Sequence, residues 1–207
     1  MLKTFLLTLG ILSVTVVGAQ ARPVSYPGGW TFITENDSSN NNALAHYTVN
    51  RNTAVGYRID YDRDTEKIFH GLQMNNLIKR WNNPDSQANI YLKTAAGFRD
   101  DEAEGFVGSQ ADWEDRRWML MYENMGMISG EDEQRKFHQK FGLGVAPYVA
   151  EFGALHTWMM FHAVHEPEND KNWQFESMLR FFKGTVLIEA GYNFTMEKPM
   201  ANAMIRF

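Results

Sequence analysis

Methionine and histidine side chains recur at alternate positions in two stretches of the sequence. Every second residue from 119 to 127 is Met except Glu123, and residues 156–162 add further soft donors. Thioether and imidazole groups bind soft cations such as Cu(I), and the chain contains no cysteine. The candidate metal ligands are Met119, Met121, His138, His156, Met160 and His162. Methionine also fills irregular gaps in protein interiors, so packing is the alternative role.

Charged side chains of both signs form a second candidate set. Each lies on the polar side of a stretch in which apolar and polar residues alternate. This ionic set consists of Arg58, Asp60, Lys79, Lys93, Asp112, Glu123, Lys140, Glu176, Arg180, Glu189 and Arg206. Charges that leave water must pair or stay hydrated, so the set either fills an interior or lines a thin polar channel. A ladder of one sign, as a strong anion pore requires, is not present.

The elements that carry these residues are strands, because apolar and polar residues alternate with a period of two. The clearest stretch is 55–61, in which Val55, Tyr57 and Ile59 alternate with Gly, Arg and Asp residues. Segments of about ten residues, separated by turn residues, continue to the end of the chain. The expected strands are residues 29–35, 43–49, 55–61, 68–81, 88–98, 106–113, 117–127, 137–145, 155–163, 173–181, 186–194 and 199–207.

The last stretch, Pro199–Phe207, has apolar residues at Ala201, Ala203 and Ile205 and ends on an aromatic ring. An apolar strand at a sheet edge promotes aggregation, and pairing with the first strand removes that edge. A final strand of this form resembles the closing strand of Gram-negative outer-membrane β-barrels. The resemblance implies an all-β fold, namely a closed antiparallel transmembrane β-barrel of about twelve strands.

In such a barrel, charges and glycines crowd the interior while aromatic residues face lipid near both interfaces. The aromatic content of 14% suits this arrangement, and the net charge of -5 argues against a nucleic-acid binder. The strands of a soluble periplasmic β-sandwich or lipocalin-like barrel also alternate between apolar and polar residues. In those folds, however, the apolar face points inward. The two architectures therefore differ in which face is exposed.

Residues 1–21 have the layout of a secretory signal peptide. Lys3 precedes an apolar run over residues 5–17, and a small-residue cleavage site ends at Ala21. We expect cleavage after Ala21, so that residues 22–207 form one outer-membrane barrel domain. No other run approaches the ~20 apolar residues of a membrane-spanning helix.

An even number of strands places both termini on the same, periplasmic side. We expect the tighter turns there, and longer polar or acidic loops on the outside. The expected turns lie near Asn50, Asn82, Glu114, Pro147 and Gly184, and the expected outer loops near Asn36, Asp62, Asp100, Glu131, Glu166 and Met196.

Nucleophilic catalysis has little support in the sequence. Neither His46 nor His156 has a serine two residues away, and neither a G-x-S-x-G nor an HExxH motif occurs. We expect no catalytic residue and no cofactor, and an envelope lipid hydrolase is the enzymatic alternative.

The segments Gly71–Asn82 and Gln110–Trp118, together with the closing strand, are similar to small uncharacterised outer-membrane barrels associated with heavy-metal efflux gene clusters. This resemblance implies copper or silver handling and contact with efflux-system components. The expected function is a narrow pore or an accessory binding barrel for a small polar or cationic solute. The alternative is a structural barrel whose acidic loops engage lipopolysaccharide.

Overall fold

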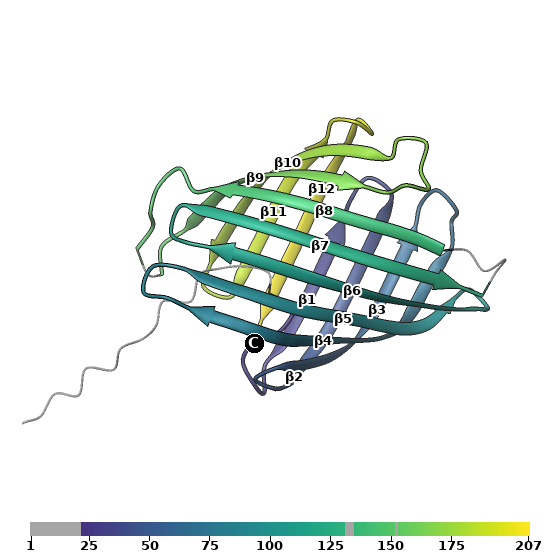
Figure 1. Cartoon of the computed structure of the whole chain (residues 1–207), viewed down its shortest axis with the longest axis horizontal. Coiled ribbons are helices and arrows are strands. Elements are labelled where there is room, and N and C mark those ends of the chain that lie inside the picture. The colour runs from purple at the N-terminus through teal and green to yellow at the C-terminus, as the bar shows by residue number, and fades with distance from the viewer. Residues whose placement is uncertain (1–21, 131–134, 152) are drawn as a thin grey trace, which may run out of the picture.

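The computed structural model describes residues 22–130, 135–151 and 153–207, and within them twelve antiparallel strands close into a barrel (Figure 1). The strands are β1 (Trp30–Asn36), β2 (Asn40–Asn50), β3 (Thr53–Asp62), β4 (Ile68–Asn82), β5 (Gln87–Arg99), β6 (Glu102–Glu114), β7 (Trp118–Ser129), β8 (Arg135–Val145), β9 (His156–His165), β10 (Trp173–Lys183), β11 (Val186–Asn193) and β12 (Lys198–Arg206). Each expected strand is present, and the predicted closed barrel is confirmed. No helix in the described residues has the length and hydropathy needed to cross a membrane.

The first and last strands close the ring, as the terminal pattern predicts. Phe32 pairs with Ile205 across the β1–β12 seam. The amide of Trp30 donates to the carbonyl of Phe207 at 3.1 Å, and the amide of Phe207 donates back at 3.0 Å. These reciprocal bonds satisfy the backbone groups that an open edge would leave unpaired.

The barrel is inverted relative to a soluble one. Leu72 on the outer face is 64% exposed, whereas the neighbouring inward residue Gln73 is buried. Tyr57, Phe161 and Phe207 are likewise exposed on the outside. The apolar face therefore points away from the interior, which is the opposite of the lipocalin-like alternative.

The connections form two groups, one at each end of the barrel. We call the end that holds the connections 37–39, 63–67, 100–101, 166–172 and 194–197 the loop end, and the opposite end the termini end. The expected contrast in length holds only in part, because residues 146–155 join β8 to β9 at the termini end, and 100–101 is short. Between β10 and β11 the turn is tight, and Gly184 adopts the positive φ of 62° that it requires.

Two expectations concern residues whose placement is not described. The signal peptide, residues 1–21, and the acidic loop at Glu131 both lie outside the described residues. Both therefore stay predictions from the sequence.

A β-bulge in β4 overturns the expected orientation of Lys79. The register with β5 shifts between Leu77 and Lys79, so that Lys79 pairs with the outward residue Ile90. Lys79 is exposed on the outer face, and Arg80 points inward, where its Nε donates to Asn89 Oδ1 at 2.6 Å. The extra residue reverses the alternation that the sequence pattern assumes.

Candidate functional site

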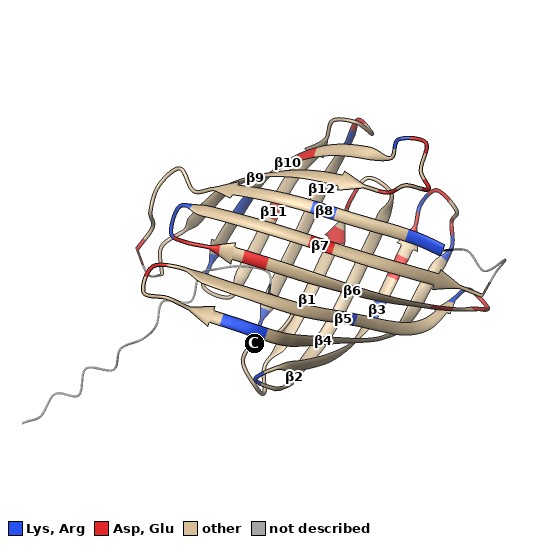
Figure 2. Cartoon of the chain, viewed as in Figure 1, with Lys and Arg blue, Asp and Glu red and all other residues tan. Residues whose placement is uncertain are grey.

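A polar cavity of about 350 Å³ opens at the loop end, and we call it the vestibule. Residues from seven strands and three of the loops line it. Charged residues, coloured in Figure 2, occur mainly on the connections and at a few strand positions. The charged lining residues are Glu35, Asp37, Asp60, Asp62, Asp64, Glu123, Glu166 and Glu168, against Arg58, Lys93, Arg99, Lys136 and Lys140. Eight carboxylates thus face five Lys or Arg side chains, so the cavity has an acidic excess.

Ion pairs at the vestibule join strands that are separated by one intervening strand in the ring. Lys93 Nζ lies 2.8 Å from Glu123 Oε1, and Lys140 Nζ lies 3.4 Å from Glu176 Oε2. Their strands β5, β7, β8 and β10 come from separate parts of the sequence. The structure therefore brings these four members of the expected ionic set together in cross-strand pairs, and their mutual attraction offsets part of the cost of leaving bulk water.

Glu35 has a different surrounding. It lines the vestibule and is exposed, and Asn42 Nδ2 donates to its Oε2 at 3.3 Å. Within the described residues, no Lys, Arg or His nitrogen lies within ion-pair distance of it. Glu35 therefore presents to the cavity a carboxylate that has no ion-pair partner among the described residues, although the charges of Arg58, Lys93 and Lys140 act on it from a longer distance. The sequence analysis did not single it out.

The rim of the vestibule is fixed by the loop between β9 and β10. His138 Nδ1 lies 2.9 Å from Glu166 Oε1, and Gln174 Nε2 donates to Glu166 Oε2 at 2.9 Å. Burial opposes ionisation of Glu166, but the His138 contact outweighs it and holds the pKa of Glu166 below its usual value. Burial raises the pKa of Asp37 on the opposite loop, against hydrogen bonds from the Asn40 and Ser39 amides.

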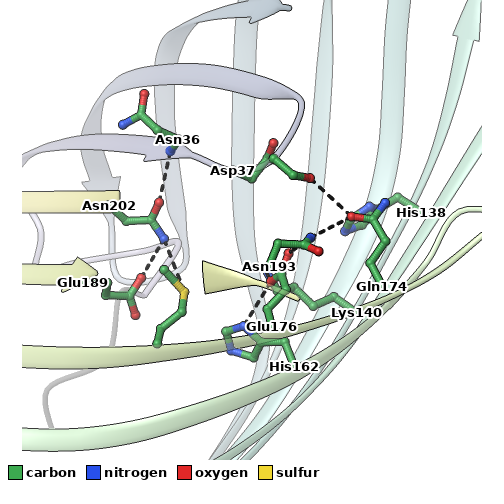
Figure 3. A network of polar contacts seen from close by, with 12 residues as sticks. Asn36, Asp37, His138, Lys140, His162, Gln174, Glu176, Glu189, Asn193 and Asn202 are labelled. Atoms are coloured by element: carbon green, nitrogen blue, oxygen red, sulfur yellow. Dashed lines mark hydrogen bonds and ion pairs between the residues drawn. The ribbon is translucent and has the colours of Figure 1, made fainter. Parts of the chain in front are cut away.

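A polar network continues inward from the rim (Figure 3). Asn193 Nδ2 donates to Gln174 Oε1 at 2.8 Å and to Glu176 Oε1 at 3.2 Å. Asn202 Nδ2 donates to Glu189 Oε2 at 2.8 Å. These hydrogen bonds connect β10, β11 and β12 beside the vestibule, so the polar groups orient one another.

Below the vestibule the interior is packed with sulfur-containing and aromatic side chains. Met119 and Met160 are both 0% exposed and pack in one apolar cluster with Trp158, Met178 and Met200. Glycine in β8 makes room for them. A Cβ added to Gly144 would lie 2.7 Å from Met160 Sδ, and one added to Gly142 would lie 3.1 Å from His162 Cδ2.

The expected metal ligands are only partly assembled. Met119 and Met160 belong to the packed cluster, and Met121 and His162 lie on either side of Gly142. His138 is at the rim, and His156 contacts the ring of Phe182.

Arg180 also opposes a cation at this position. Its Nη1 donates to Met119 Sδ at 3.5 Å, and it pairs with Glu189. Among the described residues, no group of three or more His, Cys, Asp or Glu is placed to hold a metal. Met119 and Met160 thus take part in packing, and metal binding by the expected ligand set stays a prediction from the sequence.

Residues 22–24 lie buried inside the barrel at the termini end, which the sequence analysis did not anticipate. Arg22 is 3% exposed, and its Nη2 lies 2.7 Å from Glu114 Oε1. Asn75 Nδ2 donates to the carbonyl of Pro23 at 3.0 Å. Val24 packs in a second apolar cluster with Ala54, Leu77 and Tyr91. No alternation marks this short stretch, so nothing in its composition indicated an inward position.

The remaining members of the expected ionic set lie partly at the vestibule and partly at other levels of the barrel. Asp112 accepts from Asn89 Nδ2 at 2.6 Å, and Arg206 donates to the carbonyl of Arg22 at 3.5 Å. Arg58 Nη2 lies 3.3 Å from Asp60 Oδ2 at the vestibule wall. Only Lys79 of the set points outward.

Every strand contributes at least one buried inward residue to the described interior. One such residue from each strand in turn is Thr31, Thr48, Ala54, Asn75, Tyr91, Asp112, Met119, Gly144, Met160, Met178, Leu187 and Met204. Water does not reach these side chains, so they are packed against their neighbours inside the barrel.

The histidines considered for lipid hydrolysis do not form a catalytic pair. His46 is buried inside the barrel, and His156 lies beside Phe182. Neither ring forms a hydrogen bond with a serine among the described residues. A nucleophile–base pair of the Ser–His type is therefore not assembled in this part of the chain.

No protein-family model and no curated protein matches the chain. The KdgM porin, solved in complex with disordered oligogalacturonate, is similar with a TM-score of 0.53 and 4% identity, over 86% of this chain and 98% of that one. A loop-L8 deletion mutant of OmpT, an outer membrane protein of Vibrio cholerae, has a TM-score of 0.24 and 9% identity, over 86% and 96% of the two chains. These structures give no support to a heavy-metal efflux association. The likeness to the KdgM porin establishes that this chain has the fold of an outer-membrane porin barrel.

Proposed function

We propose that this protein is an outer-membrane barrel whose vestibule admits and binds a small polar solute that carries positive charge. The observation that supports the proposal is the acidic excess of the vestibule, eight carboxylates against five Lys or Arg side chains. A cavity of about 350 Å³ lies at the small end of the range found for small-molecule sites. Glu35, which lacks a cationic partner among the described residues, is the group we assign to the solute.

The charge balance also separates this barrel from its structural neighbour. Oligogalacturonate, the molecule in the KdgM complex, carries a carboxylate on each sugar. An acidic vestibule repels such a polyanion, because like charges without counter-ions cost free energy in a confined space. A cationic solute instead replaces the water and counter-ions at Glu35.

The buried inward side chains favour binding over free diffusion. Because each described strand contributes a buried inward side chain, the resting barrel is expected to carry little steady current. We further propose the outer membrane as the location and cleavage after Ala21 as the processing step. Amino-terminal sequencing of protein from the outer-membrane fraction tests the cleavage position, with Arg22 as the expected first residue.

Calorimetry with two probes of matched length tests the solute class. The purified protein is titrated with 1,4-diaminobutane and, separately, with butanedioate. We expect heat of binding only with the diamine, and about tenfold weaker binding in Glu35→Gln, since a charge-assisted hydrogen bond contributes about 1.5–3 kcal/mol. Glu102→Gln, an exposed acid outside the vestibule lining, is the control and should bind like the wild type. Preferred binding of the dianion would refute the proposal.

A further inference from the structure

A shallow groove of about 780 Å³ crosses the outer face from β4 to β10. Its floor follows positions paired across adjacent strands: Ala111 pairs with Tyr122, Tyr122 with Phe141, and Phe141 with Ala163. A neighbouring row joins Ala88, Trp113, Leu120, Leu143 and Phe161. The groove is therefore continuous over several strands.

Alternation of small and large residues makes the groove hollow. Ala111 and Ala163 leave space between rings, and Tyr122 and Phe141 contact each other with centroids 4.9 Å apart. Trp81 and Trp113 form the wall nearest the termini end. The lining is almost wholly apolar. It therefore suits an acyl chain better than a polar solute.

Lys79 lies at the end of this groove. It pairs with Ile90, and its Nζ lies 5.8 Å from the centre of the Trp81 ring, and both partners line the groove. No carboxylate of the described residues is within ion-pair distance of Lys79. An ammonium group on an apolar outer face without a counter-ion is costly, so its position indicates an anion that the protein itself does not supply.

The tryptophans fix the level of this site in the membrane. Trp81 and Trp113 lie near the ends of β4 and β6, and Trp118 begins β7, all at the termini end. Tryptophan favours the interface between acyl chains and headgroups, so Lys79 lies where a lipid phosphate lies. A long Lys side chain reaches that level readily.

We propose that the groove and Lys79 form a binding site for an anionic phospholipid of the leaflet at the termini end, with an acyl chain in the groove and the phosphate on Lys79. The β-bulge in β4 creates the site, because without the register shift Lys79 would face the interior. The proposal rests on the membrane location of the barrel and is independent of the solute.

Native mass spectrometry of the detergent-solubilised full-length mature protein tests this site. The protein is offered equal amounts of phosphatidylglycerol and phosphatidylcholine with identical acyl chains. We expect preferential retention of phosphatidylglycerol, and a loss of about fivefold in that preference in Lys79→Gln, since a Lys near an anionic headgroup is worth about that factor. Lys183→Gln, an exposed lysine at the same end of β10, is the control and should keep the preference.

Filling the groove tests the acyl-chain half of the proposal. Ala163→Leu should reduce retention of both lipids, whereas Ala203→Leu on the outer face of β12 should not. Equal retention of the two lipids by the wild type, or a preference that survives Lys79→Gln, would overturn the proposal, as would retention of lipopolysaccharide alone. Diaminobutane binding measured on the same variants should be unchanged, so a failed solute proposal and a failed lipid proposal give different results.

Discussion

The two ends of the barrel interior use the same strand register for opposite purposes. At the loop end, inward positions carry paired charges such as Lys93 and Glu123 around an open cavity. Toward the termini end, the same faces of the same strands carry Met119 and Tyr91, which are fully buried, and the chain segment at Arg22 fills the remaining space. Whether an inward side chain contacts water or is packed therefore depends on its position along the barrel axis. The alternation of apolar and polar residues does not predict this difference.

This difference assigns stability and binding to different ends. Packed apolar contacts and a buried ion pair make the termini end the stable half, because removing one partner leaves a cavity or an isolated charge. Charges at the loop end keep access to water and are screened, so single changes there cost less stability.

The largest expected effect comes from breaking the segment that fills the termini end. Arg22→Ala leaves Glu114 as a buried charge without its partner, and we expect a loss of about 3–5 kcal/mol of unfolding free energy. Urea unfolding in detergent, followed by tryptophan fluorescence, measures it. Arg51→Ala, in an exposed turn at the same end, is the control. An unchanged midpoint would contradict the assignment of this segment to the interior.

A smaller effect is expected from truncating single methionines at two levels. Met160→Ala empties space in the packed cluster and should cost about 2–4 kcal/mol. Met125→Ala, at the vestibule wall, should cost about 1 kcal/mol or less, because it is half-buried beside an existing cavity. If both variants lose the same stability, the contrast between the two levels is wrong.

Acidification should loosen the loop end first. The pKa of Glu166 is depressed in the folded protein, so the stability it provides is present above its ordinary pKa and is lost as the pH falls through the folded value. We expect faster hydrogen exchange in residues 166–172 below about pH 4, while the segment near Arg22 stays protected. Glu166→Gln should show the faster exchange already at neutral pH.

The smallest expected effect is that of a soft metal ion. Because Arg180 donates to Met119 and the methionines are packed, Ag(I) should raise the melting temperature by less than about 1 °C. A larger rise that disappears in Met160→Leu would restore the metal site inferred from sequence and would change the description of the packed cluster.

The strands and the closed ring were predictable because lipid selects apolar residues at most outward positions. Phe32, Ile205 and Leu72 obey that rule over the full strand length. The orientation of Lys79 was not predictable. A β-bulge depends on how a strand pairs with its neighbour, so the sequence of β4 alone does not indicate it.

The candidate sites were less predictable than the strands. The alternation of inward and outward positions predicted Met119 and Met160 on the inner face. It gave no information on their position along the barrel axis or on how tightly they are packed. The position of Arg22 depends on Glu114, 92 residues away, and no local pattern encodes such a contact. Glu35 was not identified from the sequence, because its proposed role depends on the lack of an ion-pair partner among the described residues, and only the structure shows that.

The packing of buried side chains below the vestibule has a consequence for the number of copies of the protein that a cell tolerates. An outer membrane excludes noxious compounds only while its aqueous leaks are few, and each open porin adds one. Met119, Met160 and Tyr91 are fully buried inside the barrel. The closed resting state that we propose on this basis would add no leak, so the abundance of the protein would carry no such penalty on the permeability barrier.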